Sequence, residues 1–289
     1  MNGAMRSAST VMKVAVVMLL GAAASSAQAT LDSDNRYPNV GVIMVWRVDD
    51  AGRPVELRGF ASGTLIRTHV MITAGHFTAP VKALGGIPPT IRLFASFSPT
   101  DARDPDTWIP VIGAATHPSM PHCPPPPQCD PTDEVLAAPL EPGIADVGLV
   151  FLEQPPANIK PAVLATPGTL EKSEGARTTI VGYGTTSPGP SSVAVDAWPW
   201  DGRRRVRIST VRKVVDETWG LWSIPSYVCS GDSGGGIFLR ERSSRPAERL
   251  VANVSDGGKD CRRHNNHNRL DTRAIQTWID DTAKANRDQ

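Results

Sequence analysis

The sequence predicts an all-β protein made of two packed β-barrels and a C-terminal α-helix. Its 289 residues include 26 prolines and 25 glycines, and no long segment repeats the 3.6-residue helical period. Short apolar segments of strand length recur instead, in two sets that are each large enough for a domain. The net charge of +1 and the 20% of charged residues favour neither nucleic acid nor an anionic membrane as a partner.

Residues 1–29 are predicted to be a secretory signal peptide. Arg6 and Lys13 form a positive region, residues 14–24 are apolar, and Ala27-Gln28-Ala29 is a small-x-small cleavage site. The alternative is an N-terminal membrane anchor, for which the apolar run is short. We therefore expect a secreted or periplasmic protein, free of the membrane once it is cut after Ala29. The polar stretch from Thr30 to Asn39 is expected to be a flexible lead-in.

Two domains are predicted, at residues 30–155 and 156–289, joined by the Pro-rich connector 153–160. The first has strand-like segments at 40–48, 55–60, 61–66, 69–73, 91–97, 108–116 and 143–152. Its Pro-rich residues 117–142 are expected to form a surface loop. The second has strand-like segments at 178–183, 206–215, 235–239 and 250–255, and the apolar spacing over 273–284 predicts an amphipathic helix. The arginine run 203–205 is interpreted as a solvated strand start.

Because the protein is expected to be exported, its four cysteines are candidates for disulfide bonds. Three pairings are possible. The favoured one joins Cys123 to Cys129 around a proline-rich loop and Cys229 to Cys261. Cys261, His264 and His267 also fit a C-x₂-H-x₂-H zinc pattern. That site is disfavoured because an exported Cys261 can pair with Cys229. Neither a metal nor a cofactor is expected.

Residues 229–236, Cys-Ser-Gly-Asp-Ser-Gly-Gly-Gly, place the hydroxyl of Ser233 in a run of glycines. A serine nucleophile needs a base, and glycines allow backbone N–H groups to converge where an oxyanion would form. The pattern also fits the nucleophile elbow of α/β-hydrolases, in which Asp and His follow the Ser. Only 56 residues follow Ser233, and the plausible partners, His76 and Asp146, both precede it. The order His, Asp, Ser is that of chymotrypsin.

Five blocks over residues 38–282 resemble the trypsin/chymotrypsin-type secreted serine proteases, particularly the bacterial members. The matching blocks are Ser62-Gly63-Thr64-Leu65-Ile66 with Thr73-Ala74-Gly75-His76, Asp146-Val147-Gly148-Leu149, Val181-Gly182-Tyr183-Gly184, Cys229 to Gly235, and Val254-Ser255-Asp256-Gly257. The resemblance implies two six-stranded antiparallel barrels with the site between them. Cys261 falls at the spacing of the family's partner for Cys229.

The resemblance also assigns roles. Ser233 would be the nucleophile, His76 the general base and acid, and Asp146 the residue that orients the imidazole. The backbone N–H groups of Gly231 and Ser233 would form the oxyanion hole. The substrate-binding positions would be Tyr227, Ser255, Asp256 and Gly257, with Ser255 also bonded to Asp146.

Several residues depart from the family pattern. Ala61 and Phe77 stand where the family has a disulfide pair, and both cysteines are absent together. Tyr227 stands at the pocket floor where trypsin-like members carry Asp, so preference for Arg or Lys is not expected. No Ile-Val-Gly-Gly segment occurs that could supply an N-terminal amine to Asp232. Either Asp232 has another partner or an unrecognised cleavage is needed.

The sequence thus predicts a secreted, monomeric serine endopeptidase that acts on polypeptides. The alternative is a protease-fold protein that binds or regulates partners with little or no catalysis, and an esterase is a minor third reading. Presence of all three triad residues favours the enzyme.

Overall fold

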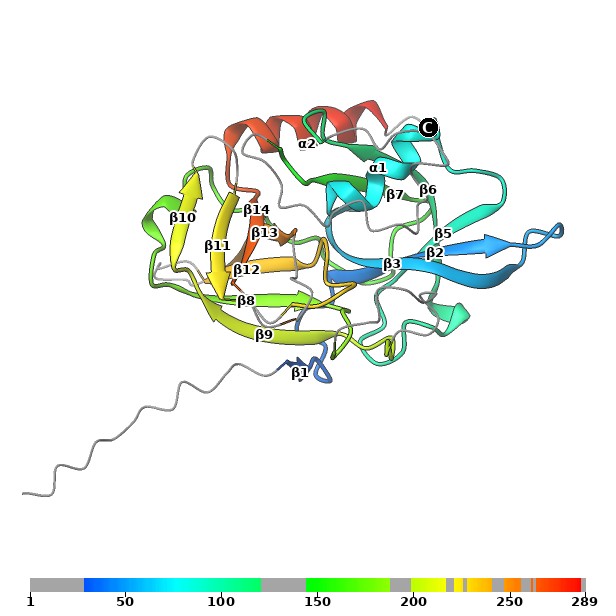
Figure 1. Ribbon diagram of the computed structural model, residues 1–289, viewed down its shortest axis with the longest axis horizontal. Helices are drawn as coiled ribbons and strands as arrows, with labels where there is room; N and C mark the ends of the chain where they lie inside the picture. The colour runs from blue at the N-terminus through cyan, green and yellow to red at the C-terminus, as the bar shows by residue number, and fades with distance from the viewer. Residues whose placement is uncertain are drawn as a thin grey trace, which may run out of the picture.

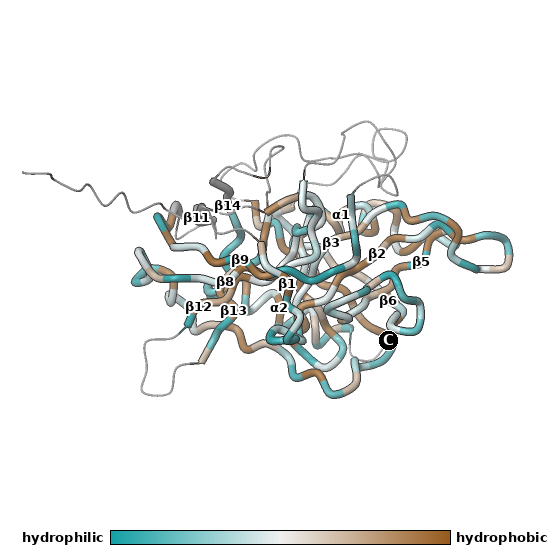
Figure 2. The backbone as a smooth tube through the Cα atoms, turned by 90° about the horizontal axis from the view of Figure 1, so that it is seen from below, coloured by the Kyte–Doolittle hydropathy of each residue, from teal (hydrophilic) through white to brown (hydrophobic). Residues whose placement is uncertain are grey.

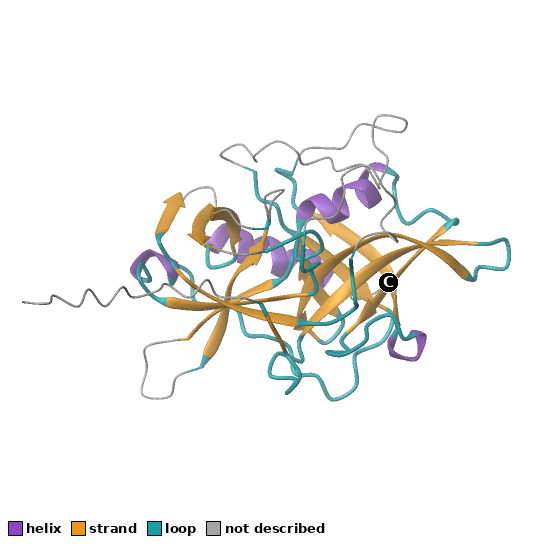
Figure 3. Ribbon diagram, turned by 60° about the horizontal axis from the view of Figure 1, so that its bottom comes forward, coloured by secondary structure: helices purple, strands orange, loops and turns teal. Residues whose placement is uncertain are grey.

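The computed structural model describes residues 29–120, 144–187, 199–216, 221–225, 228–240, 247–255, 261 and 264–286. Two β structures lie side by side (Figures 1 and 3), and the two α-helices lie along the upper side of the view in Figure 1. The first is a closed antiparallel barrel in the order β2-β3-β4-β7-β6-β5. Its strands are β2 (Val40–Val48), β3 (Pro54–Arg67), β4 (Val70–Thr73), β5 (Ile91–Ser96), β6 (Ile109–Thr116) and β7 (Gly148–Leu152).

The second structure is a sheet that, over the described residues, has eight strands in the order β1-β9-β8-β12-β13-β14-β11-β10. Its strands are β1 (Thr30–Leu31), β8 (Arg177–Gly182), β9 (Arg205–Thr210), β10 (Lys213–Asp216), β11 (Leu221–Pro225), β12 (Gly236–Arg240), β13 (Glu248–Val254) and β14 (His264–Arg269). Short 3₁₀ turns occur at η1 (Pro105–Thr107) and η2 (Leu170–Lys172). The predicted all-β class, with antiparallel sheets, a barrel and a C-terminal helix, is confirmed.

Side chains alternate between the two faces of each strand, and this alternation divides the hydrophobic core into separate clusters. On β2, Ile43 points into the closed barrel and packs with Leu65 and Met71. Its neighbours Val42 and Met44 belong instead to a larger cluster that also holds residues of the second sheet. Successive side chains of a strand point to opposite faces, so one strand can serve both clusters. Apolar segments accordingly run through the middle of both halves (Figure 2).

Two α-helices are described. The predicted C-terminal helix is α2 (Arg273–Ala285), and the Thr272 hydroxyl caps it by accepting from the Ile275 N–H. α2 reaches the first barrel, where Trp278 meets the His117 ring edge-on at 5.1 Å and Asp280 pairs with Arg67. The sequence did not predict α1 (Gly75–Ala83), which follows β4 directly. No described helix is long and apolar enough to span a membrane.

The expectation of a flexible lead-in at residues 30–39 is wrong. β1 pairs with β9, and Asp32 is only 2% exposed. The Asp32 carboxylate accepts from the backbone N–H groups of Arg36 and Tyr37 and from Arg204 Nε at 2.9 Å. The arginine run is not solvated either, because Arg204 is fully buried and Arg205 nearly so. A buried arginine needs a paired carboxylate, and the N-terminal segment supplies it.

Replacing Asp32 by alanine is expected to destabilise the protein by about 3–5 kcal/mol, because Arg204 would keep a buried and unpaired charge. Chemical denaturation followed by tryptophan fluorescence measures this change. Asp34→Ala is the matched control: Asp34 is exposed two residues away, so its loss should change stability by less than about 0.5 kcal/mol. Equal effects of the two substitutions would contradict a role for the buried pair.

Candidate active site

His76 is the second residue of α1 and faces Asp146 across the first barrel's rim. Its backbone N–H donates to Asp146 Oδ1 at 2.6 Å, and its ring Nδ1 lies 2.8 Å from Oδ2. The carboxylate thus occupies the N-terminus of a helix, where backbone N–H groups have no partner within the helix. Gly75 is required for this approach, since a Cβ there would lie 2.8 Å from the Val147 nitrogen.

Asp146 is fully buried, and several hydrogen-bond donors contact its carboxylate. In addition to His76, the Ser255 hydroxyl donates to Oδ2 at 2.6 Å. Burial alone would raise the pKa of Asp146, but the charge and hydrogen bonds of His76 and the bond from Ser255 outweigh it and hold this pKa below its usual value of 3.8. Asp146 is therefore ionised near neutral pH. Its carboxylate accepts a hydrogen bond from the His76 Nδ1–H, so in the neutral ring Nε2 carries no proton and can accept one.

Ser233 lies in a loop that both halves of the molecule hold in place. The Ser62 N–H of β3 donates to the Ser233 carbonyl at 2.8 Å, and the Gly234 N–H donates to the Val254 carbonyl at 2.7 Å. Gly234 has a φ of 80° and packs so closely that a Cβ would lie 2.7 Å from the Ala74 nitrogen. The Ser233 loop therefore lies against the segment that leads into His76. Over the described residues, no hydrogen bond joins the Ser233 hydroxyl to His76.

Two backbone donors next to Ser233 are uncommitted. Across the part of the chain that the structure describes, the N–H groups of Gly231 and Ser233 donate to no acceptor. Gly231 has a φ of 88°, and the Ser62 hydroxyl fixes its carbonyl at 2.7 Å. A Cβ on Gly231 would lie 2.0 Å from the Phe60 ring. Only glycine therefore fits a position from which the peptide can present its N–H.

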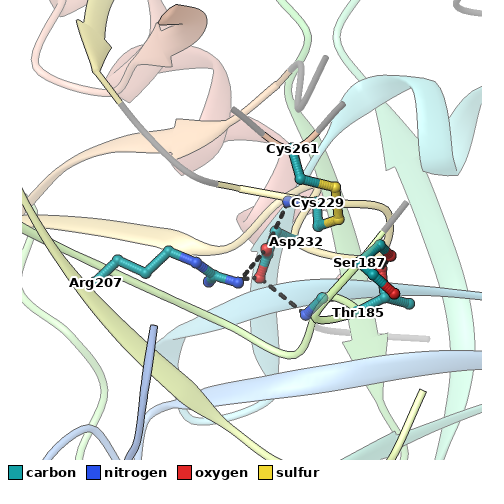
Figure 4. The surroundings of a disulfide bond; sticks show 7 residues. Thr185, Ser187, Arg207, Cys229, Asp232 and Cys261 are labelled. Carbon is teal, nitrogen blue, oxygen red and sulfur yellow. Dashed lines mark hydrogen bonds and ion pairs between the residues drawn. A yellow bond between two sulfur atoms is a disulfide. The ribbon is translucent and has the colours of Figure 1, made fainter. Parts of the chain in front are cut away.

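Asp232 is fully buried and forms an ion pair with Arg207 of β9 (Figure 4). The Arg207 Nη2 lies 2.9 Å from Oδ2 and Nη1 lies 3.1 Å from Oδ1. The backbone N–H groups of Gly184 and Cys229 each donate to the carboxylate at 2.9 Å. Asp232 thus has a cation within the chain, and the first of the two possibilities raised by the sequence is the one observed.

The disulfide between Cys229 and Cys261 lies next to this pair (Figure 4). It confirms that half of the predicted pairing and makes Cys261 unavailable as a zinc ligand. Cys123 and Cys129 lie outside the described residues, as do the signal peptide and the predicted substrate-binding residues Tyr227, Asp256 and Gly257.

Three residues of the site were not predicted: Arg207, Asn253 and Asn268. Arg207 lies between Val206 and Ile208 on a strand. A charged residue flanked by β-branched apolar residues could have indicated a buried charge in the sequence. Asn253 lies within the predicted strand segment 250–255, whereas Asn268 lies on β14, which the sequence did not predict as a strand. Both contact the Asp146 backbone.

The geometry combines a serine at a glycine-rich turn, a histidine oriented by a buried carboxylate, and two backbone N–H groups that have no acceptor among the described residues. No protein-family model and no curated protein matches the chain. Among solved structures, the chain is similar to one titled "Structure of GrC" (granzyme C), a chymotrypsin-fold serine protease. The TM-score is 0.56 at 16% identity, over 89% of this chain and 98% of that chain. The chain therefore has a chymotrypsin-like fold.

Proposed function

We propose that the protein is a secreted serine endopeptidase that hydrolyses peptide bonds through an acyl-enzyme on Ser233. The observation that carries the proposal is the His76–Asp146 pair beside the Ser233 loop, with its two uncommitted N–H groups. The disulfide between Cys229 and Cys261 agrees with export to an oxidising compartment. The fold's known members support the reaction class by analogy alone.

In the proposed reaction, Ser233 Oγ attacks the carbonyl carbon of the scissile peptide while His76 Nε2 takes the hydroxyl proton. The N–H groups of Gly231 and Ser233 donate to the oxygen that becomes negative. His76 then gives its proton to the leaving amine nitrogen as the C–N bond breaks, and an acyl ester remains on Ser233. Water repeats the sequence and releases the acid. Asp146 stays ionised and stabilises the charged imidazole.

The absent bond between the Ser233 hydroxyl and His76 is compatible with this mechanism. Catalytic hydrogen bonds are often long in a site without substrate and tighten only when the substrate binds. Ser233 itself is partly exposed.

A fluorophosphonate probe tests the proposal directly, because it phosphonylates only a serine that a neighbouring base activates. The purified chain beginning at Thr30 is expected to be labelled at Ser233, as located by peptide mass mapping. Ser233→Ala should abolish labelling, and His76→Ala should slow it by at least about 10³-fold. Ser230→Ala, three residues away, is the matched control and should label at the unchanged rate.

Labelling by a chain whose Ser233 is alanine would overturn the assignment. No labelling of the folded wild-type chain, with or without limited proteolysis, would favour the alternative reading of a protein that binds partners through a protease fold.

We also propose a substrate class. With Tyr227 rather than an acid at the pocket floor, the preferred residue before the scissile bond is small or apolar, not Arg or Lys. Once labelling at Ser233 has been established, cleavage of a peptide library measures that preference.

A further inference from the structure

The backbone of Asp146 has no strand partner of its own. Residues 144–147 are not part of a strand, and β7 begins only at Gly148, which pairs with Thr73 and Thr116. Asp146 is nevertheless fully buried, so its peptide N–H and C=O need partners from elsewhere.

Two buried asparagines of the second sheet supply these partners. The Asn268 side-chain oxygen accepts from the Asp146 N–H at 3.0 Å, and its Nδ2 donates to the Asp146 carbonyl at 3.1 Å. Asn253 Nδ2 donates to the same carbonyl at 3.2 Å. The exposed fractions of Asn253 and Asn268 are 0% and 1%. Asn268 therefore pairs with Asp146 through both backbone groups, as a neighbouring strand would.

The two asparagines lie directly opposite each other in the β13–β14 ladder. Ser255, which donates to the carboxylate, follows Asn253 by two residues and so continues the same face. Residues of two inner strands of the second sheet, β13 and β14, and of the segment just after β13 thus hold the N–H, the carbonyl and the carboxylate of Asp146. Asn253 Nδ2 also lies 3.4 Å from the carbonyl of Thr73, which ends the strand before His76.

Only an amide meets these requirements. A valine at 268 would leave the Asp146 N–H without its partner, and a valine at 253 would remove one of the two donors to the Asp146 carbonyl. An ionised aspartate at 268 would face that carbonyl with a like partial charge. Burying two amides is costly unless they are hydrogen-bonded. Here, most hydrogen bonds of the two amides go to the backbone of Asp146.

We propose that Asn253 and Asn268 are positioning residues for Asp146. They fix its peptide so that the two carboxylate oxygens meet the backbone N–H and the ring Nδ1 of His76. The inference rests on the proposed function insofar as it predicts a rate, but the positioning can also be observed without catalysis.

The first test compares Asn268→Val with Thr178→Val. Thr178 lies on β8 of the same sheet, is 1% exposed, and its hydroxyl has no partner among the described residues. A displacement of a catalytic group by about 1 Å can cost about 10² in rate. We expect Asn268→Val to slow fluorophosphonate labelling by about 10²-fold, with a shifted acid limb of its pH–rate profile, and Thr178→Val to change neither.

A double-mutant cycle separates positioning from general structure. In an Asp146→Asn background, Asn268→Val should add little further loss of labelling rate, because no carboxylate remains to be positioned. A merely structural role would slow both backgrounds by the same factor, and that result would overturn the inference. If Asn268→Val does not fold, the same cycle is run with Asn253→Val, which removes one hydrogen bond to Asp146 instead of two.

A readout without catalysis distinguishes failure of this inference from failure of the proposed function. In Ser233→Ala protein, the proton on His76 Nδ1 should give a low-field NMR resonance protected by Asp146. Adding Asn268→Val should remove that resonance or speed its exchange with water. An unchanged resonance refutes the positioning role even if the wild-type chain is never labelled. A lost resonance supports it in the same circumstance.

Discussion

Replacing Asp146 by asparagine is expected to slow the labelling of Ser233 by about 10⁴-fold while the chain still folds. An amide can accept from the His76 N–H but can also donate toward Nδ1, which favours the tautomer with its proton on Nε2. That nitrogen then cannot take the Ser233 proton. The measurement is the second-order rate of fluorophosphonate labelling near pH 8, with thermal unfolding as the check on folding. A loss below about 10-fold would contradict the role assigned to Asp146.

The same substitution should alter the pH dependence of stability. The pKa of Asp146 lies below its usual 3.8 in the folded protein. The folded state therefore binds fewer protons at this group than the unfolded state does, and the resulting stability is present above about pH 4 and lost as the pH falls. Asp146→Asn should remove that contribution, so its stability should decline less steeply than that of the wild type in this acidic range.

Replacing Arg207 by methionine is expected to cost about 3–5 kcal/mol of stability and to abolish labelling, because the buried Asp232 would lose its only ion-pair partner among the described residues. Asp232 precedes the nucleophile and follows Gly231, so a displaced carboxylate also displaces both N–H groups of the proposed oxyanion hole. Urea denaturation and the labelling rate measure the two effects.

Arg205→Met is the matched control for this prediction. Arg205 is on the same strand and is itself nearly buried, but its partner Asp201 is 42% exposed. Water can therefore solvate the remaining carboxylate, and we expect a smaller loss of stability than for Arg207→Met. The double variant Arg207→Met with Asp232→Asn should recover part of the stability, since no buried charge is left unpaired. Equal losses from the Arg205 and Arg207 substitutions would contradict the proposal.

The Arg207 pair also bears on activation. Because Arg207 already pairs with Asp232, we expect that Asp232 needs no newly cut N-terminal amine. A chain with several extra residues before Thr30 should therefore be labelled at the same rate as one that begins at Thr30. Labelling that depends on an exact N-terminus would show that Arg207 does not suffice.

Local pattern was enough to find the triad candidates and the main elements. Ser233 stands out because a glycine-rich loop after a cysteine is readable in eight residues, and Asp146 because a carboxylate precedes an apolar strand. The helix α2 was predicted from its 3.6-residue period and confirmed. α1 was missed because nine residues with Pro80 inside give no clear period.

The partners of the buried polar groups were decided by the tertiary structure. Arg207 is 25 residues from Asp232, Asn268 is 122 from Asp146, and Arg204 is 172 from Asp32. The arginine run looked solvated because its local neighbours are polar and charged. Its actual environment is made by the N-terminal segment that carries Asp32, whose place beside the run no local pattern predicted.

Local pattern in the sequence was sufficient for the strands of the first barrel, the C-terminal helix and the nucleophile loop, because backbone preference and side-chain alternation act over a few neighbouring residues. It was not sufficient for α1 or for the strands β1, β11 and β14. The pairing of each buried charge or amide was decided only when the two sheets came together. An unpaired buried group is unstable, yet which distant group satisfies it depends on the closed fold.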